Sequence, residues 1–301
     1  MTEKRRRWII NVVLILAVVA FVGFSLFPLL GDAFKADRSG EATPSSAQAT
    51  PSAKQEELKA QAKGYELVLQ REPDNQTALR GLVEARLQLQ DIKGVVEPLE
   101  RLAKLNPDQT RYGVLLAQAK QYAGDREGAA EAYRTILTAQ PGDMMALQGL
   151  VGLLIEQKRP EAAVGLLQDT LKTANEANQV KPGSVDVPSV QLLLGQVYAE
   201  QKRYDEAITI YDEAIKTSDK DFRPVLAKAL VFKEQGKDEA AKPLFNSAIS
   251  LAPAEYKDQI NQLASGKPPT APTAAPTTAP TTAPNQAPAS PAEAQPSPAA
   301  P

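Results

Sequence analysis

The chain has 301 residues, with 34 basic and 36 acidic side chains and a formal net charge of −2. Such a balance offers no strongly basic surface for neutralising phosphates, so nucleic acid is not expected as a partner. Cysteine and histidine are both absent. This removes disulfides, thiolate and imidazole metal sites, and the commonest general base at neutral pH. We therefore expect no metal and no cofactor, and catalysis is only a remote alternative.

The first segment combines a basic start, residues 1–7, with an apolar run, residues 8–30. Lys4–Arg7 carries four positive charges, and the 23 residues from Trp8 to Leu30 carry no charge. At about 1.5 Å per residue, a helix of this length spans a hydrocarbon core of about 30 Å. We expect a single transmembrane helix at 8–30, in contact with the lipid bilayer. A cleaved signal peptide is the alternative, although its apolar region usually has only about 7–15 residues.

The distribution of basic residues around this run predicts its orientation. Four of them precede it, whereas only Lys35 and Arg38 follow it closely. The positive-inside rule then keeps the N-terminus in the cytoplasm and sends the rest of the chain across the membrane.

Two segments of low apolar content flank a long helical region. Residues 31–53 are rich in Ser, Thr, Ala and Pro and read as a flexible linker. Residues 54–265 have helical periodicity throughout. Residues 266–301 hold eleven of the 24 prolines and no aliphatic side chain larger than Ala, which is typical of a disordered tail with polyproline II character. A plain spacer is favoured over a Pro-rich ligand for a partner domain.

The prolines of the helical region mark an internal repeat. Pro73, Pro107 and Pro141 are 34 residues apart, and Pro253 follows 112 residues later, which is three periods of 34 plus ten. Residues 175–187, which include a Pro-Gly pair, break the helical pattern and provide the place for those ten extra residues. The expected repeats are 76–109, 110–143, 144–177, 188–221 and 222–255.

Small and large side chains recur at fixed positions of this 34-residue period. Position 8 is small or β-branched: Val83, Ala117, Val151, Gly195 and Ala229. Position 20 is also small or β-branched: Val95, Ala129, Ala163, Ala207 and Ala241. Position 24 is large: Leu99, Tyr133, Leu167, Tyr211 and Phe245.

This period and this pattern resemble the tetratricopeptide repeat (TPR), a hairpin of two helices. The resemblance implies an all-α fold, a solenoid of about five TPR hairpins after the transmembrane helix. In such a stack one hairpin cannot bury its apolar face alone, so neighbouring repeats complete the core. A lone helix at 54–71 and a polar helix at 255–264 are expected at the ends of the stack.

Two kinds of residue depart from the repeat pattern. Pro98 and Pro243 fall inside the second helices of their repeats, where we expect a local kink or a late helix start. Arg86 and Lys120 occupy position 11, where an apolar residue is usual in this family. The first two repeats therefore match less closely than the others.

The TPR resemblance also predicts a binding face. In this family, positions 2, 5, 9, 12 and 13 of the first helices line a concave groove that commonly holds a peptide. The candidate partner-binding residues are Arg80, Arg111, Gln118, Tyr122, Met145, Gln148, Leu192, Gln196, Arg223 and Leu226. This mixture of amides, aliphatic side chains and arginines suits an extended or helical protein segment better than an acidic tail. We expect these residues to have little role in packing.

The predicted function is a membrane-tethered scaffold or assembly factor that binds a partner protein in the groove. The layout resembles membrane-anchored TPR proteins of cyanobacteria, one of which interacts with the light-dependent protochlorophyllide reductase. This implies a thylakoid or plasma membrane and a role in photosynthetic or pigment-enzyme assembly. That reductase lies on the cytoplasmic side, which disagrees with the predicted orientation.

Two alternatives remain. One is a periplasm-facing factor for envelope or cytochrome biogenesis. The other, more remote, is an enzyme with a site in the groove. Acidic pairs such as Asp205-Glu206 fall where a second helix starts, and negative charge suits a helix N-terminus without any catalytic role.

Overall fold

The computed structural model describes residues 51–266, so the predicted membrane span at 8–30, most of the predicted linker and nearly all of the predicted tail lie outside the described residues. Twelve α-helices and no strand make up the described part. They are α3 (Pro51–Arg71), α4 (Gln76–Gln88), α5 (Val96–Leu105), α6 (Thr110–Tyr122), α7 (Arg126–Ala139), α8 (Met144–Glu156), α9 (Pro160–Val180), α10 (Val187–Glu200), α11 (Tyr204–Thr217), α12 (Phe222–Glu234), α13 (Asp238–Leu251) and α14 (Ala254–Ser265). Between residues 51 and 266, no helix combines the length and the apolar character needed to cross a membrane.

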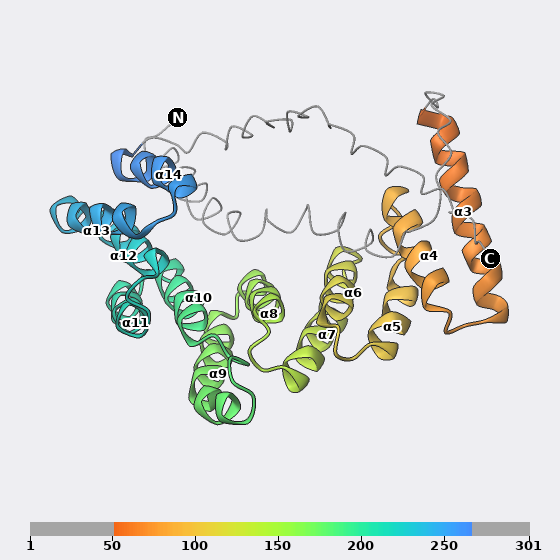
Figure 1. Ribbon diagram of the computed structural model, residues 1–301, viewed down its shortest axis with the longest axis horizontal. Coiled ribbons are helices and arrows are strands. Elements are labelled where there is room, and N and C mark those ends of the chain that lie inside the picture. Colours follow the sequence, from red (N-terminus) through yellow and green to blue (C-terminus); the bar gives the residue numbers. More distant parts are fainter. Residues whose placement is uncertain (1–50, 267–301) are drawn as a thin grey trace, which may run out of the picture. The chain divides into compact units, whose positions relative to one another are not determined.

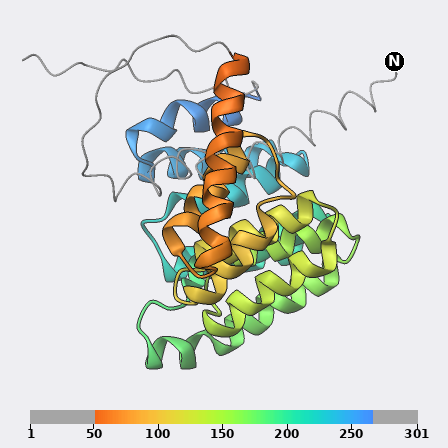
Figure 2. The same cartoon turned by 90° about the vertical axis from the view of Figure 1, so that its right-hand side faces the viewer.

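The helices pair into five consecutive hairpins, from α4–α5 to α12–α13, with α3 before the first hairpin and α14 after the last. The second helix of each hairpin also packs on the first helix of the next. Figure 1 shows α4, α6, α8 and α10 on one side of this row and α5, α7, α9 and α11 on the other. Figure 2 views the row from the end where α3 is the outermost described helix. The predicted all-α helical-hairpin solenoid is thus confirmed for the described residues.

Local sequence signals explain where the helices begin and end. Four of the five first helices, α4, α8, α10 and α12, begin after an Asn or Asp cap. The Asn75 side chain accepts a hydrogen bond from the Ala78 N–H at 2.9 Å, and Asp143 does the same for Ala146 at 2.9 Å. Such caps satisfy backbone donors that have no partner inside the helix. At the other end, α3, α5, α7 and α13 each stop two residues before a proline of the repeat. The caps and prolines therefore reproduce the same hairpin every 34 residues.

The turn between the two helices of a hairpin has one residue with positive φ, always at position 15. Glycine occupies it in two repeats, as Gly124 and Gly236. In the other three the residue is Gln90, Lys158 or Lys202, with φ between 58° and 61°. A side chain in this region is disfavoured because its Cβ approaches the backbone. The tight hairpin therefore imposes the turn geometry even where the sequence lacks glycine.

The core follows the predicted small and large positions. Every residue at positions 8, 20 and 24 is buried, and Val83, Val95, Ala163 and Ala207 have no exposed surface. Gly195 shows why position 8 must be small, because a Cβ there would lie 2.3 Å from the ring of Tyr211. The Tyr211 ring at position 24 therefore sets how closely α10 and α11 approach each other.

Polar side chains at position 11 form an ion pair or a hydrogen bond with the residue at position 25 on the preceding helix. Lys120 Nζ lies 2.8 Å from Glu100, and its side chain is only 19% exposed. The same two positions hold the following pairs: Arg86–Glu66 at 2.5 Å, Lys120–Glu100 at 2.8 Å and Tyr198–Gln168 at 2.9 Å. The cations that depart from the family pattern are therefore accommodated by carboxylates on the neighbouring helix.

Helix α9 continues beyond residue 175, where the sequence pattern predicted a break. The break expected from residue 175 starts only after Val180, because Ala174 is buried and Ala177 packs on the central cluster. Asn178 then ties the following loop to the helix. Its Nδ2 donates to the Val185 carbonyl at 2.9 Å, and its Oδ1 accepts from the Val185 N–H at 2.9 Å.

Three further boundaries differ from expectation or refine it. Helix α3 begins at Pro51, three residues before the expected start, and proline is well suited to a first helical turn. The late start expected near Pro98 is confirmed, since α5 begins at position 21 whereas the other second helices begin at position 17. Near Pro243 the helix does not start late, since α13 begins at Asp238, position 17, and contains the proline. The alternative expected there, a local kink, stays a prediction.

Candidate protein-binding groove

All ten candidate residues lie on first helices, from α4 to α12, on the side of the row that we call the groove face. They differ in exposure. Gln118, Tyr122 and Arg223 are exposed, and Tyr122 is 75% exposed. The remaining seven are half-buried: Arg80, Arg111, Met145, Gln148, Leu192, Gln196 and Leu226.

The aliphatic candidates are also packing residues, contrary to our expectation. Met145 and Leu192 pack against the central core cluster, which includes Leu147 and Leu194. Leu226 packs against the last cluster, around Phe245. These side chains sit at the edge of the first helix, where one flank contacts the second helix and the other faces the groove. They therefore combine a structural role with an accessible apolar surface.

The three arginines are held by neighbours within the same unit. Arg223 donates to both carboxylate oxygens of Asp221 at 2.7–3.0 Å, and this hydrogen bonding raises the pKa of Arg223. Arg111 lies over the Tyr112 ring, 4.9 Å from its centroid. Arg80 Nε donates to the Gln76 carbonyl at 3.3 Å. Among the described residues, only Arg223 of these three arginines is paired with a carboxylate.

The glutamine amides on the groove face are better placed than the arginines to bind a partner. Within residues 51–266, the side chains of Gln118, Gln148 and Gln196 make no hydrogen bond with protein atoms. Each amide offers both a donor and an acceptor, which suits the backbone of an extended chain. They lie on α6, α8 and α10, so successive hairpins present one amide each.

An apolar pocket opens between α4, α5 and α6. Its volume is about 360 Å³. The lining includes two candidates, Gln118 and Tyr122, and Leu87, which occupies groove position 12 of the first repeat. The other lining residues lie outside the predicted groove positions. The lining residues are Val83, Leu87, Gln90, Ile92, Val95, Leu99, Leu115, Gln118, Ala119 and Tyr122. None of them is charged.

The late start of α5 explains this pocket. Helix α6 packs on α8, α8 on α10 and α10 on α12, whereas α4 and α6 make fewer contacts than any of these pairs. The segment that would be the first turn of α5 is a separate turn, in which Asp91 Oδ1 accepts from the Gly94 N–H at 3.0 Å. A Cβ on Gly94 would lie 2.0 Å from the Asp91 carboxylate, so a larger residue there would displace the side chain that accepts this hydrogen bond. Pro98 was the sequence signal that could have located the pocket.

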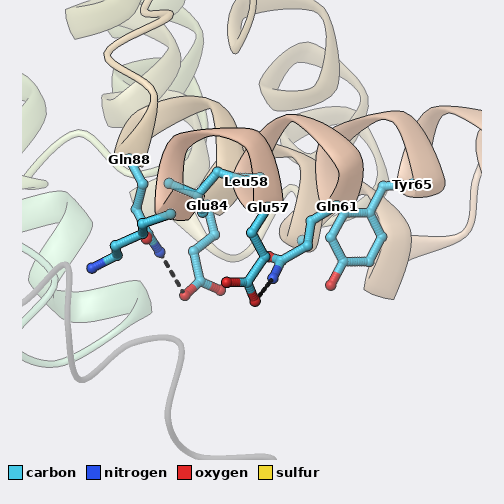
Figure 3. A pocket seen from close by; sticks show the side chains of 9 residues that line it. Glu57, Leu58, Gln61, Tyr65, Glu84 and Gln88 are labelled. Atoms are coloured by element: carbon cyan, nitrogen blue, oxygen red, sulfur yellow. Dashed lines mark hydrogen bonds between the residues drawn. The ribbon is translucent and has the colours of Figure 1, made fainter. Parts of the chain in front are cut away.

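A second, polar pocket of about 250 Å³ lies on the other flank of α4, between α4 and α3. Figure 3 shows the carboxylates of Glu57 and Glu84 turned to the same open side. Gln61 donates to Glu57 at 3.2 Å and Gln88 donates to Glu84 at 3.4 Å. Neither carboxylate forms a salt bridge with another described residue. Sequence reasoning treated α3 as an end helix and did not include its residues in the groove.

The described residues offer little support for a catalytic site. No group of three potential metal-ligating carboxylates occurs between residues 51 and 266. In the acidic pair at the start of α11, Glu206 accepts from Arg203 Nε at 2.9 Å, and this bond lowers the pKa of Glu206. Glu206 therefore takes part in a surface ion pair at the start of α11.

Repeated hairpins of two helices, small residues at their crossings and a continuous face of first helices define a helical-repeat protein of the interaction type. The family model described as tetratricopeptide repeat matches residues 54–253. The chain therefore belongs to the tetratricopeptide-repeat family, whose domains bind peptides or proteins in their groove.

The chain is also similar to several individual proteins. The chain is 25% identical, over 256 residues, to the protein SLOW GREEN 1, chloroplastic, of Arabidopsis thaliana, covering 85% of this chain and 77% of that protein. The crystal structure of MamA matches with a TM-score of 0.41 and 18% identity, over 61% of this chain and 94% of MamA. YrrB, described as a TPR protein with an unusual peptide-binding site, matches with a TM-score of 0.39 and 11% identity, over 67% of this chain and 99% of YrrB.

Proposed function

We propose that this protein is a membrane-tethered scaffold or assembly factor that binds a partner protein on its groove face. The observation that carries the proposal is the line of accessible amides, aliphatic side chains and Tyr122 along successive first helices, in a fold whose relatives bind proteins. The apolar run at 8–30 supports tethering by a single transmembrane helix, with the N-terminus in the cytoplasm.

The proposed setting is photosynthetic, at a thylakoid membrane, where the protein assists a pigment-related enzyme or complex. Two observations support it. The layout of one apolar run, a TPR domain and a Pro-rich tail resembles cyanobacterial membrane-anchored TPR proteins, and a relative of this chain carries the designation chloroplastic. The partner is a protein, and the repeats act by holding it rather than by catalysing a reaction.

A double substitution on the groove face tests this function. Tyr122→Ala with Leu192→Ala removes two large apolar surfaces from α6 and α10, and large side chains dominate typical interface energies. Capture of the partner from detergent-solubilised membranes should weaken at least about tenfold, or about 1.4 kcal/mol. Circular dichroism must show a folded variant, because Leu192 also packs on the core. Val180→Ala, at a side chain that is 88% exposed on α9, is the matched control.

The opposite outcome has a clear meaning. If the folded double variant keeps its partner and a chain lacking residues 266–301 loses it, the Pro-rich tail is the ligand and the groove function is wrong.

A further inference from the structure

The two pockets beside α4 form one composite feature of the groove face. Glu84 and Gln88 of α4 line the polar pocket, whereas Val83 and Leu87 line the apolar pocket. Glu84 and Leu87 are three residues apart, so their side chains are neighbours on the helix surface. Helix α4 is therefore a ridge with a carboxylate-lined pocket on one flank and an uncharged apolar pocket on the other.

Charge indicates what the polar pocket accepts. It contains two carboxylates, Glu57 and Glu84, against one ammonium group, Lys54. Both carboxylates have only amide partners among the described residues, so each keeps free acceptor capacity. A Lys or Arg side chain entering the pocket meets two carboxylates from two different helices. Charge-assisted hydrogen bonds of this kind are stronger than neutral ones.

The uncharged lining of the apolar pocket indicates which kind of side chain it accepts. Its floor is formed by Val83, Val95 and Leu99, each at most 2% exposed, and its rim carries Tyr122, which is 75% exposed. No lining residue is charged, so a charged group would lose hydration there without gaining a partner. A volume of about 360 Å³ is large enough for one aliphatic or aromatic side chain.

Building on the proposed function, we propose that the first hairpin is a two-pocket reader of an extended partner segment, with a Lys or Arg in the polar pocket and an aliphatic or aromatic side chain in the apolar pocket. The pockets flank a helix of about 10 Å diameter, and an extended chain advances about 3.3 Å per residue. The two side chains are therefore three or four residues apart in the partner. Gln118, on the rim, is placed to hydrogen-bond the backbone beside the apolar side chain.

The proposal depends on features that α3 and the first hairpin have and that the other described hairpins lack. Only α5 starts late enough to leave α4 and α6 apart, and only α3 and α4 provide the carboxylate pair of the polar pocket. The remaining hairpins are expected to lengthen the interface without setting this sequence preference.

A peptide array probed with the full-length chain in detergent tests the reader. The probes are synthetic decapeptides in a Gly/Ser background, with Lys at one position and Leu two to six positions away. Matched peptides carry Glu in place of Lys, or Ser in place of Leu. The expected result is preferential binding at a separation of three or four residues, reduced at least tenfold by either replacement.

Two variants separate the pockets. Glu57→Gln with Glu84→Gln should abolish the preference for Lys over Glu and keep the preference for Leu over Ser. Tyr122→Ala should do the reverse, since it removes the rim of the apolar pocket. Glu176→Gln and Val180→Ala, at exposed residues of α9, are the matched controls and should bind like the wild type.

Several outcomes would overturn the proposal: no preferred separation, unchanged preferences in both pocket variants, or strongest binding to peptides from residues 1–50 or 267–301 of this chain, which would make the chain its own ligand. Failure of the two-pocket reader is distinguishable from failure of the general function. If Leu192→Ala alone weakens capture of the natural partner while the pocket variants do not, the groove binds its partner elsewhere, and only the two-pocket reader is wrong.

Discussion

Side chains at the helix crossings determine how closely each hairpin can close. Ala207, at position 20 of the fourth repeat, has no exposed surface, and in the same hairpin the Tyr211 ring fills the space beside Gly195. Cores packed this densely have little room for added atoms. A larger residue at position 20 must therefore push α10 and α11 apart.

Ala207→Trp should lower the free energy of unfolding by several kcal/mol, about 3 kcal/mol or more, because an indole at this crossing overpacks the hairpin. Thr209→Trp, at an exposed residue of the same helix, is the matched control. Thermal unfolding followed by circular dichroism measures both. Equal melting temperatures for the two variants would mean that the repeat register is wrong.

The ion pair between Lys120 and Glu100 makes stability depend on pH. The hydrogen bond to Glu100 raises the pKa of Lys120 above its usual 10.5. The folded chain therefore binds this proton more tightly than the unfolded chain does. The resulting stabilisation is complete below pH 10.5 and is lost as the pH rises through the raised pKa.

Glu100→Gln should lower the free energy of unfolding by about 0.5–1 kcal/mol at neutral pH, the range for a partly exposed pair. The difference between variant and wild type should shrink as the pH rises above about 10.5. Urea unfolding at a series of pH values measures it. A difference that stays constant up to about pH 11 would show that the pair contributes nothing through this proton.

At the scale of elements, the extension of α9 and its loop stand out from the regular hairpins. Most of the extra residues of this repeat interval lie in α9 itself, which has 21 residues where α7 and α11 have 14. Asn178 replaces the missing regular turn by bonding to both the N–H and the carbonyl of Val185, which is 2% exposed. One side chain thus connects the end of α9 to the entry of α10.

Asn178→Ala should lower the free energy of unfolding by about 1–3 kcal/mol, because it leaves buried backbone groups of Val185 without partners. Hydrogen exchange should accelerate in residues 181–186 before the rest of the domain is affected. Asn175→Ala, at an exposed asparagine of the same helix, is the control. Equal exchange in the two variants would contradict a role for this clasp.

At the scale of the whole molecule, the described helices build apolar clusters from one end of the row of hairpins to the other. The apolar clusters consist of residues between Ala62 and Leu263. Helix α14 closes the last one with Ile260, which is 1% exposed, and with Tyr256, whose ring stacks on Phe222 at 5.4 Å. Stacking of neighbouring hairpins, rather than lipid, therefore supplies the stability of the repeats.

Deleting residues 1–30 should release the protein from membranes and leave its helical circular dichroism spectrum and melting temperature unchanged. The full chain should remain in the membrane after alkaline carbonate washing, since an apolar helix of 23 residues inserts stably. A mature N-terminus after Ala33 or Ala36 would identify a cleaved signal peptide and contradict the anchor.

The repeat register was predictable from the sequence because its signals are local. Caps such as Asn75, the prolines after α5 and α7, and small residues such as Ala207 act within one hairpin, and they recur every 34 residues. The candidate positions on first helices were implied by the family resemblance once this register was known. The exposure of each candidate did not, because it depends on the second helix packed behind it, as for Leu192.

Only the tertiary structure decided how neighbouring hairpins meet. The pairing of Lys120 with Glu100, the continuation of α9 to Val180 and the gap between α4 and α6 all depend on distances between elements far apart in the chain. Periodicity specifies which face of a helix is buried, but not how far its neighbour lies from it. The apolar pocket beside Tyr122 is a consequence of that distance, and so it could be located only once the hairpins had been packed together.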